Sequence, residues 1–238
     1  MRAIGFAGVI FLGLLCEGIP HSATASEGHL VRTNRQEPVS YSAIRRERGI
    51  IALTFLGVDW KYLAVAKRMA VGQRGRLRAL EPPWDQAVGG DTPIDYVVDF
   101  YRRKAGNFYQ IARANPGYIL VGMYSELGEG ADRLITTWET GSAQALIIFA
   151  RRGDEIREVF SWAGKTTPEY VGLANNGVPY LVVTDGEVFE TEGKTTYPET
   201  ASIYAWEGSG YVLQKKVSWE KRFEALRDSW PAAYPKRR

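Results

Sequence analysis

Four carboxylates are gathered in one short stretch, and two facing carboxyl groups are what glycoside hydrolysis requires. In such a reaction one group acts as general acid, and the other acts as nucleophile or base. The cluster makes a carbohydrate-active hydrolase one alternative for this chain, and a charged, exposed loop explains the same residues equally well. The four residues are Asp185, Glu187, Glu190 and Glu192.

Other catalytic chemistries have little support in the residue types. The chain contains one cysteine, Cys16, and two histidines, His21 and His29. Zinc sites rely heavily on Cys and His, and a Ser-His-Asp arrangement needs an imidazole base. His29 would be the one histidine left if the first 25 residues were removed, close to an end that is often poorly ordered. The two glycine-rich motifs that bind phosphate groups, G-x-x-x-x-G-K-[ST] and a strand-borne G-x-G-x-x-G, do not occur in the sequence. From these residue types we expect no metal and no cofactor.

A basic loop with a tryptophan is the most unusual insertion and the main candidate for binding. Side chains that bind partners concentrate on loops held by a rigid scaffold, so this loop could contact an anionic glycan or a protein. The alternative is a solvated excursion with its tryptophan packed against a sheet. The candidate binding residues are Arg74, Arg76, Arg78 and Trp84.

The N-terminus has the features of an export signal. Arg2 precedes an uncharged apolar run over residues 3–16, and Ala23-Thr24-Ala25 forms a small-residue cleavage pattern. A run of about 14 residues suits a signal-peptide core and is shorter than the roughly 20 needed to span a bilayer. We expect an exported protein, periplasmic or extracellular, which is cleaved near Ala25 and does not span the membrane afterwards. Cleavage would remove Cys16, so the mature chain would have no internal disulfide.

The charge is modest and uneven along the chain. Residues 26–125 hold 15 basic and 9 acidic side chains, and residues 126–238 hold 14 and 17. A basic half can face an anionic surface or polysaccharide, although solvated loops explain it too. We expect a protein or polysaccharide partner and no nucleic acid, and the oligomeric state stays open.

An internal repeat divides the rest of the chain into three similar units. A pair of apolar runs around a turn occurs three times, at residues 51–66, 119–138 and 170–184. A hairpin-like stretch follows each pair, at residues 96–111, 145–160 and 201–213. Gly106, Gly153 and Gly210 lie about 47 and 57 residues apart, near the spacing of propeller blades. Runs rich in Val, Ile, Tyr, Phe and Trp between turn residues predict strands, so each unit predicts four antiparallel strands in one all-β domain.

These paired runs resemble FG-GAP or VCBS-type propeller repeats over residues 50–220. The resemblance includes the stretch that follows the third pair, Ile-Tyr-Ala-Trp-Glu-Gly-Ser-Gly-Tyr at residues 203–211. The resemblance implies propeller-like packing. Closed propellers use four to eight blades, and three units are recognisable here. Residues 26–49 and 69–92 either supply a degenerate fourth blade, or the units form an open stack. The family often carries a calcium loop, for which Glu126, Glu129 and Asp132 are the counterpart, with a solvated turn as the alternative.

The C-terminal part predicts a helix over residues 218–230, with Ser218 as its cap. Trp219, Phe223, Leu226 and Trp230 follow helical spacing, so we expect this apolar stripe to dock on the β core, with partner binding as the alternative. The resulting domain plan is a signal peptide at 1–25, an N-terminal segment at 26–49 and a single β-repeat domain at 50–238. We expect a non-catalytic protein that acts by binding or assembly.

Overall fold

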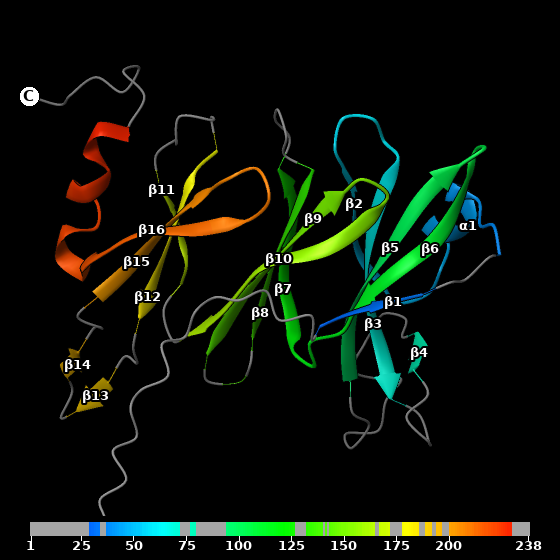
Figure 1. Ribbon diagram of the computed structural model, residues 1–238. Coiled ribbons are helices and arrows are strands. Elements are labelled where there is room, and N and C mark those ends of the chain that lie inside the picture. Colours follow the sequence, from blue (N-terminus) through cyan, green and yellow to red (C-terminus); the bar gives the residue numbers. More distant parts are fainter. Residues whose placement is uncertain are drawn as a thin grey trace, which may run out of the picture.

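Three antiparallel sheets stand side by side in the computed structural model of this chain, and a short helical segment follows the last one (Figure 1). The prediction of a mostly β fold with a C-terminal helix is confirmed. The structure describes residues 29–33, 37–71, 77–79, 94–126, 132–139, 141, 143–164, 167–171, 178–185, 189–191, 194–196 and 200–229. The proposed signal peptide lies outside them. Among the described helices, none is long and apolar enough to cross a membrane.

The first sheet has the order β1-β6-β5-β3-β2, and β4 pairs with β3. Its six strands exceed the four that each unit predicts, since β1 and β4 join it. The strands are β1 (Leu30–Arg32), β2 (Ile50–Leu56), β3 (Tyr62–Val71), β4 (Leu77–Ala79), β5 (Ile94–Lys104) and β6 (Asn107–Ala114).

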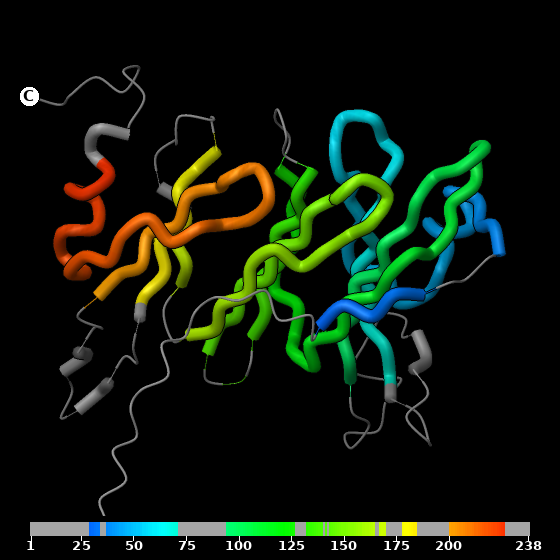
Figure 2. Tube along the Cα trace, viewed as in Figure 1, coloured from blue at the N-terminus to red at the C-terminus, as the bar shows by residue number. Residues whose placement is uncertain are grey.

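The second and third sheets have four strands each, in the orders β10-β9-β8-β7 and β11-β12-β15-β16. The second sheet contains β7 (Ile119–Glu126), β8 (Arg133–Glu139), β9 (Gln144–Arg152) and β10 (Glu155–Gly164). The third contains β11 (Glu169–Val171), β12 (Tyr180–Asp185), β15 (Thr200–Trp206) and β16 (Tyr211–Ser218). A separate pair is formed by β13 (Phe189–Thr191) and β14 (Lys194–Thr196). Figure 2 follows the chain from the first sheet to the third without a return.

The central strands of the second sheet, β8 and β9, are buried on both faces, because this sheet stands between the other two. Its strand β9 is buried from Ala145 to Ala150, which matches a continuous apolar run rather than an alternating one. On one side Phe149 meets Phe100 of the first sheet, with ring centroids 5.2 Å apart. On the other side Phe160 meets Tyr204 of the third sheet, also at 5.2 Å.

The outer faces of the two end sheets are covered by short helices. Helix α1 (Tyr41–Arg45) places Ile44, which is fully buried, against Leu63, Val65 and Phe108 of the first sheet. At the other end, Leu226 packs on Val182 and Ile203 of the third sheet. Because each of these outer faces carries a helical segment of the same chain and no further sheet, the three sheets form an open stack and not a closed propeller.

The C-terminal segment forms two 3₁₀ helices, η2 (Trp219–Lys221) and η3 (Glu224–Ser229), instead of one regular helix. Ser218 makes no side-chain capping hydrogen bond. Arg222 donates its backbone N–H and its Nη1 to the same carbonyl of Trp219, which closes a tight turn there. The segment therefore docks on the sheet as predicted, with a different helical geometry.

Candidate binding surface

The turn between β2 and β3 holds an exposed tryptophan in an uncommon backbone conformation. Trp60 has φ +54°, in the left-handed region that bulky residues rarely adopt. Gly57 opens the turn at φ +75°, and a Cβ atom there would lie 2.2 Å from Oδ1 of Asp132. The turn is thus a tight, specific structure that lies close to the second sheet.

An ion-pair chain fixes this turn to the second sheet. Asp59 Oδ1 accepts the backbone N–H of Lys61 at 3.1 Å, and Asp59 Oδ2 accepts Nη1 of Arg151 at 2.8 Å. Arg151 Nε also lies 2.7 Å from Oδ2 of Asp132, and its guanidinium lies 5.2 Å from the ring centroid of Tyr62. Burial alone would raise the pKa of Asp59, but the hydrogen bonds from Arg151 and Lys61 outweigh it and hold that pKa below its ordinary value.

The Trp60 side chain extends a row of aromatic rings on the outer face of the first sheet. Trp60 is 60% exposed, and its ring centroid lies 4.9 Å from that of Phe55. Phe55 in turn lies 5.7 Å from Tyr41 of α1 and 6.3 Å from the buried Phe108. We call Tyr41, Phe55 and Trp60 the aromatic surface. It is held rigidly, because each ring rests on another ring or on the sheet.

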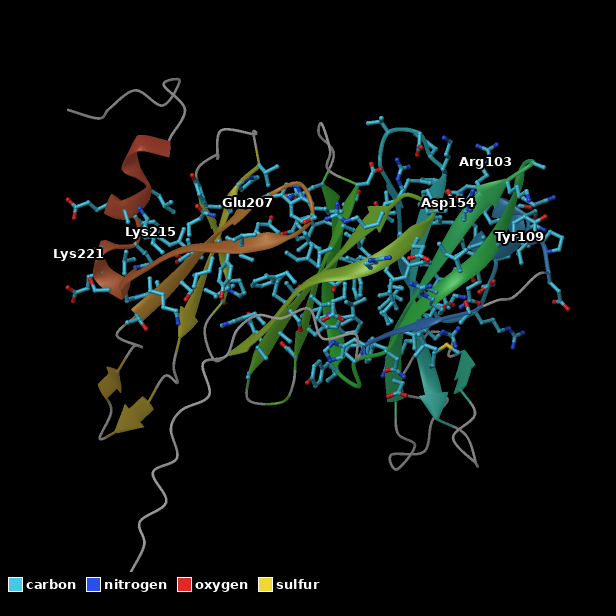
Figure 3. All side chains as sticks on the ribbon, in the orientation of Figure 1. Arg103, Tyr109, Asp154, Glu207, Lys215 and Lys221 are labelled. Atoms are coloured by element: carbon cyan, nitrogen blue, oxygen red, sulfur yellow. The ribbon has the colours of Figure 1, made fainter. Side chains whose placement is uncertain are left out.

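Three cations flank the aromatic surface. The guanidinium of Arg45 lies 5.9 Å from the ring centroid of Tyr41. Lys61 follows Trp60 directly, and its carbonyl accepts the backbone N–H of Arg103 at 2.7 Å. Arg103 is exposed beside the β5–β6 turn, opposite Phe108 in the strand register (Figure 3). We call Arg45, Lys61 and Arg103 the flanking cations.

A buried ionic cluster lies on the same face of the sheet, farther along β3 and β5. Lys67 Nζ donates to Glu47 and, at 3.1 Å, to Tyr101 Oη, and it lies 2.9 Å from Oδ2 of Asp99. Arg113 binds the Asp99 carboxylate with Nε at 2.6 Å and Nη2 at 2.9 Å. Burial opposes the charge on Lys67, but Asp99 and Glu47 outweigh it, so the Lys67 pKa is raised. A lysine held this firmly in its charged form is not a general base, and the cluster joins β3, β5 and β6 to Glu47, which lies between α1 and β2.

The sequence-predicted binding loop contributes nothing to this surface in the described part of the chain. Arg74, Arg76 and Trp84 lie outside the described residues, and Arg78 lies in β4 with a side chain outside them. Their role in binding stays a prediction.

The calcium and hydrolase alternatives receive no geometric support. Glu129 lies outside the described residues, while Glu126 pairs with Arg133 and Asp132 pairs with Arg151. No group of three His, Cys, Asp or Glu side chains suited to a metal occurs among the described residues. The proposed hydrolytic carboxylates, Asp185, Glu187, Glu190 and Glu192, have side chains outside the described part.

Three other tryptophans pack as expected from their places in strands. Trp138 is fully buried, Trp206 is 6% exposed, and Trp162 packs against the core between the second and third sheets. Trp60 was missed, because it follows an apolar run and a turn and carries no motif of its own. His29 lies beside the second sheet, with Nδ1 3.2 Å from Oε2 of Glu158 in β10.

The comparisons with known proteins do not assign this chain to a family. No protein-family model, no curated protein sequence and no solved structure matches this chain. The resemblance to FG-GAP or VCBS-type repeats therefore stays a prediction from the residues, and the geometry of the surface carries the argument about function.

Proposed function

We propose that this chain is an exported, non-catalytic β-repeat protein that acts by binding or assembly in the cell envelope or outside the cell. The observation that carries the proposal is the exposed, left-handed Trp60 on a braced aromatic surface. Backbone strain of this kind costs about 1–3 kcal/mol and concentrates at ligand clamps and other functional sites. Tryptophan is also enriched among the residues that dominate binding energy.

Preorganisation supports a binding role for this surface. The Asp59–Arg151 hydrogen bond holds the turn, and Phe55 supports the indole ring from below. A side chain that is already fixed loses little conformational freedom when a partner covers it. A partner would therefore gain contact area on Trp60 without the cost of ordering the loop.

The proposal also includes the repeat origin of the three sheets and the export of the chain. We infer that the three sheets descend from one four-stranded repeat of the propeller type, with β1 and β4 as additions to the first copy. In each sheet the core strands follow one another in chain order, as β2-β3-β5-β6, β7-β8-β9-β10 and β11-β12-β15-β16. The apolar run and the Ala23-Thr24-Ala25 pattern support export with cleavage near Ala25.

The test is affinity capture with the tagged mature chain from its own envelope and medium fractions. Wild type is compared with Trp60→Ala and with Phe223→Ala, which removes an aromatic ring that is 41% exposed at the opposite end of the stack. We expect a defined protein or glycan that wild type and Phe223→Ala retain and Trp60→Ala loses. Equal capture by all three proteins would contradict a binding role for Trp60.

A further inference from the structure

We propose that the aromatic surface and its flanking cations bind an acidic polysaccharide, which rests on the proposed binding function and names its ligand class. The aromatic surface comprises Tyr41, Phe55 and Trp60, and the cations are Arg45, Lys61 and Arg103. The three rings form a row, with Arg45 at its Tyr41 end and with Lys61 and Arg103 at its Trp60 end. An acidic sugar polymer carries apolar ring faces and carboxylate or sulfate groups side by side, so it can contact both the rings and the cations.

The aromatic part fits a sugar ring. One face of a pyranose consists mainly of C–H groups, which pack well against the flat, electron-rich face of an indole. Trp60 is 60% exposed and is supported by Phe55 at 4.9 Å between ring centroids. The exposed part of Trp60 can therefore receive a sugar ring without any rearrangement of the turn.

The charged part fits an anion on that sugar. Arg45 and Arg103 are exposed and have no carboxylate partner within the described residues. The Lys61 side chain is 65% exposed and lies 3.4 Å from Asp59, a carboxylate that Arg151 also binds at 2.8 Å. Among nearby carboxylates, Glu47 is already bound by Lys67. Positive charge thus remains available next to the rings, and charge-assisted hydrogen bonds to acidic groups are its natural use.

A sugar polymer fits this place better than an acidic peptide strand does. Extended peptides commonly add to a free sheet edge, and β2 is the edge strand nearest the aromatic surface. This strand also contacts the second sheet, where Thr54 Oγ1 is 3.0 Å from Ser125 Oγ of β7. The remaining contact area consists of ring faces and exposed cations, which suit a ligand that needs no backbone pairing.

The experiment measures binding of the full mature chain to three soluble polymers by titration calorimetry. The probes are polygalacturonate, neutral dextran and poly-glutamate. The variants are Trp60→Ala and the double variant Arg45→Gln/Arg103→Gln. The matched control is Lys216→Gln/Lys221→Gln, which removes one exposed charge in β16 and one in η2, where Figure 3 labels Lys221.

We expect polygalacturonate to bind and dextran not to bind. Each surface variant should weaken binding by about tenfold or more, the control should stay within about twofold, and added salt should weaken wild-type binding. The ligand class would be overturned if wild type failed to bind polygalacturonate or if the control lost as much affinity as the surface variants. It would also be overturned if poly-glutamate bound as tightly as polygalacturonate. If affinity capture still depends on Trp60 in those cases, the proposed binding function stands and the ligand class alone is wrong.

Discussion

Trp60 combines a left-handed backbone with an exposed indole ring, and neither feature stabilises a fold by itself. What holds it is its neighbours: Asp59 is bound by Arg151 of the second sheet, and Phe55 lies beneath the ring. The strain and the stacking are separable, because the strain comes from Cβ and the stacking comes from the indole.

Two substitutions at this residue separate these contributions. Trp60→Ala removes the ring and keeps Cβ in the left-handed region, whereas Trp60→Gly removes both. We expect Trp60→Gly to be more stable than Trp60→Ala by about 1 kcal/mol, because glycine adopts positive φ readily. The free energies of unfolding come from urea titration. An alanine variant as stable as the glycine variant would show that the turn relaxes.

Asp59 makes the stability of the folded chain depend on pH, and the sign of this dependence follows from the pKa of Asp59. The pKa is lowered from 3.8 in the folded chain, where the hydrogen bonds from Arg151 and Lys61 outweigh the effect of burial. The ionised carboxylate therefore adds stability above pH 3.8, and this is lost as the pH falls through the lower, folded pKa. We expect Asp59→Asn to be less stable than wild type at pH 7, with the difference in unfolding free energy narrowing as the pH falls below 3.8. A gap that stays constant in urea titrations across that range would contradict the role of this charge.

At the scale of elements, strands could be predicted well because their apolar runs are local features of the sequence. The pairs β2–β3, β7–β8 and β11–β12 fall where the internal repeat predicts them, as do the hairpins β5–β6, β9–β10 and β15–β16. Register could not be predicted. A bulge between Phe100 and Tyr101 shifts the pairing of β5 with β6, so that Phe100 lies opposite Ala112 and Tyr101 lies opposite Gln110, and no local feature of the sequence marks this bulge.

The covering helices and the aromatic surface could not be derived from local patterns. Helix α1 is five residues long, so it shows no helical periodicity, and it is defined by Ser40 as N-cap and by Ile44 in the core. The aromatic surface joins residues from α1, β2 and the β2–β3 turn, and the flanking cation Arg103 lies in β5. Tyr41, Phe55 and Arg103 become neighbours through tertiary packing alone, so their spacing in the sequence does not predict that they lie close together.

At the scale of the whole molecule, the second sheet shares one core with each neighbour. Trp138 and Phe149 belong to the core toward the first sheet, and Leu146 and Phe160 belong to the core toward the third. Since β8 and β9 contribute to both cores, loss of either end sheet would expose the middle one. The three sheets should therefore unfold together.

Substitutions at the two covered ends test this cooperativity. Ile44→Ala and Leu226→Ala each remove a buried side chain, at opposite ends of the stack. We expect each to destabilise the chain by roughly 2–5 kcal/mol and to lower the midpoint of one shared calorimetric transition. Matched Ser42→Ala and Glu224→Ala changes at exposed positions should have little effect. Separate transitions that respond to one end only would show independent sheets.

The order of the sheets along the chain bears on how a growing polypeptide folds. Each sheet is built from one continuous stretch, at residues 30–114, 119–164 and 169–218, so most pairings close over short loops and favour rapid folding. A chain that emerges from its N-terminus completes the first sheet before the second has been synthesised. Helix α1 already packs on the outer face of that sheet, so the apolar surface that remains to be buried by the second sheet is the inner face around Phe100.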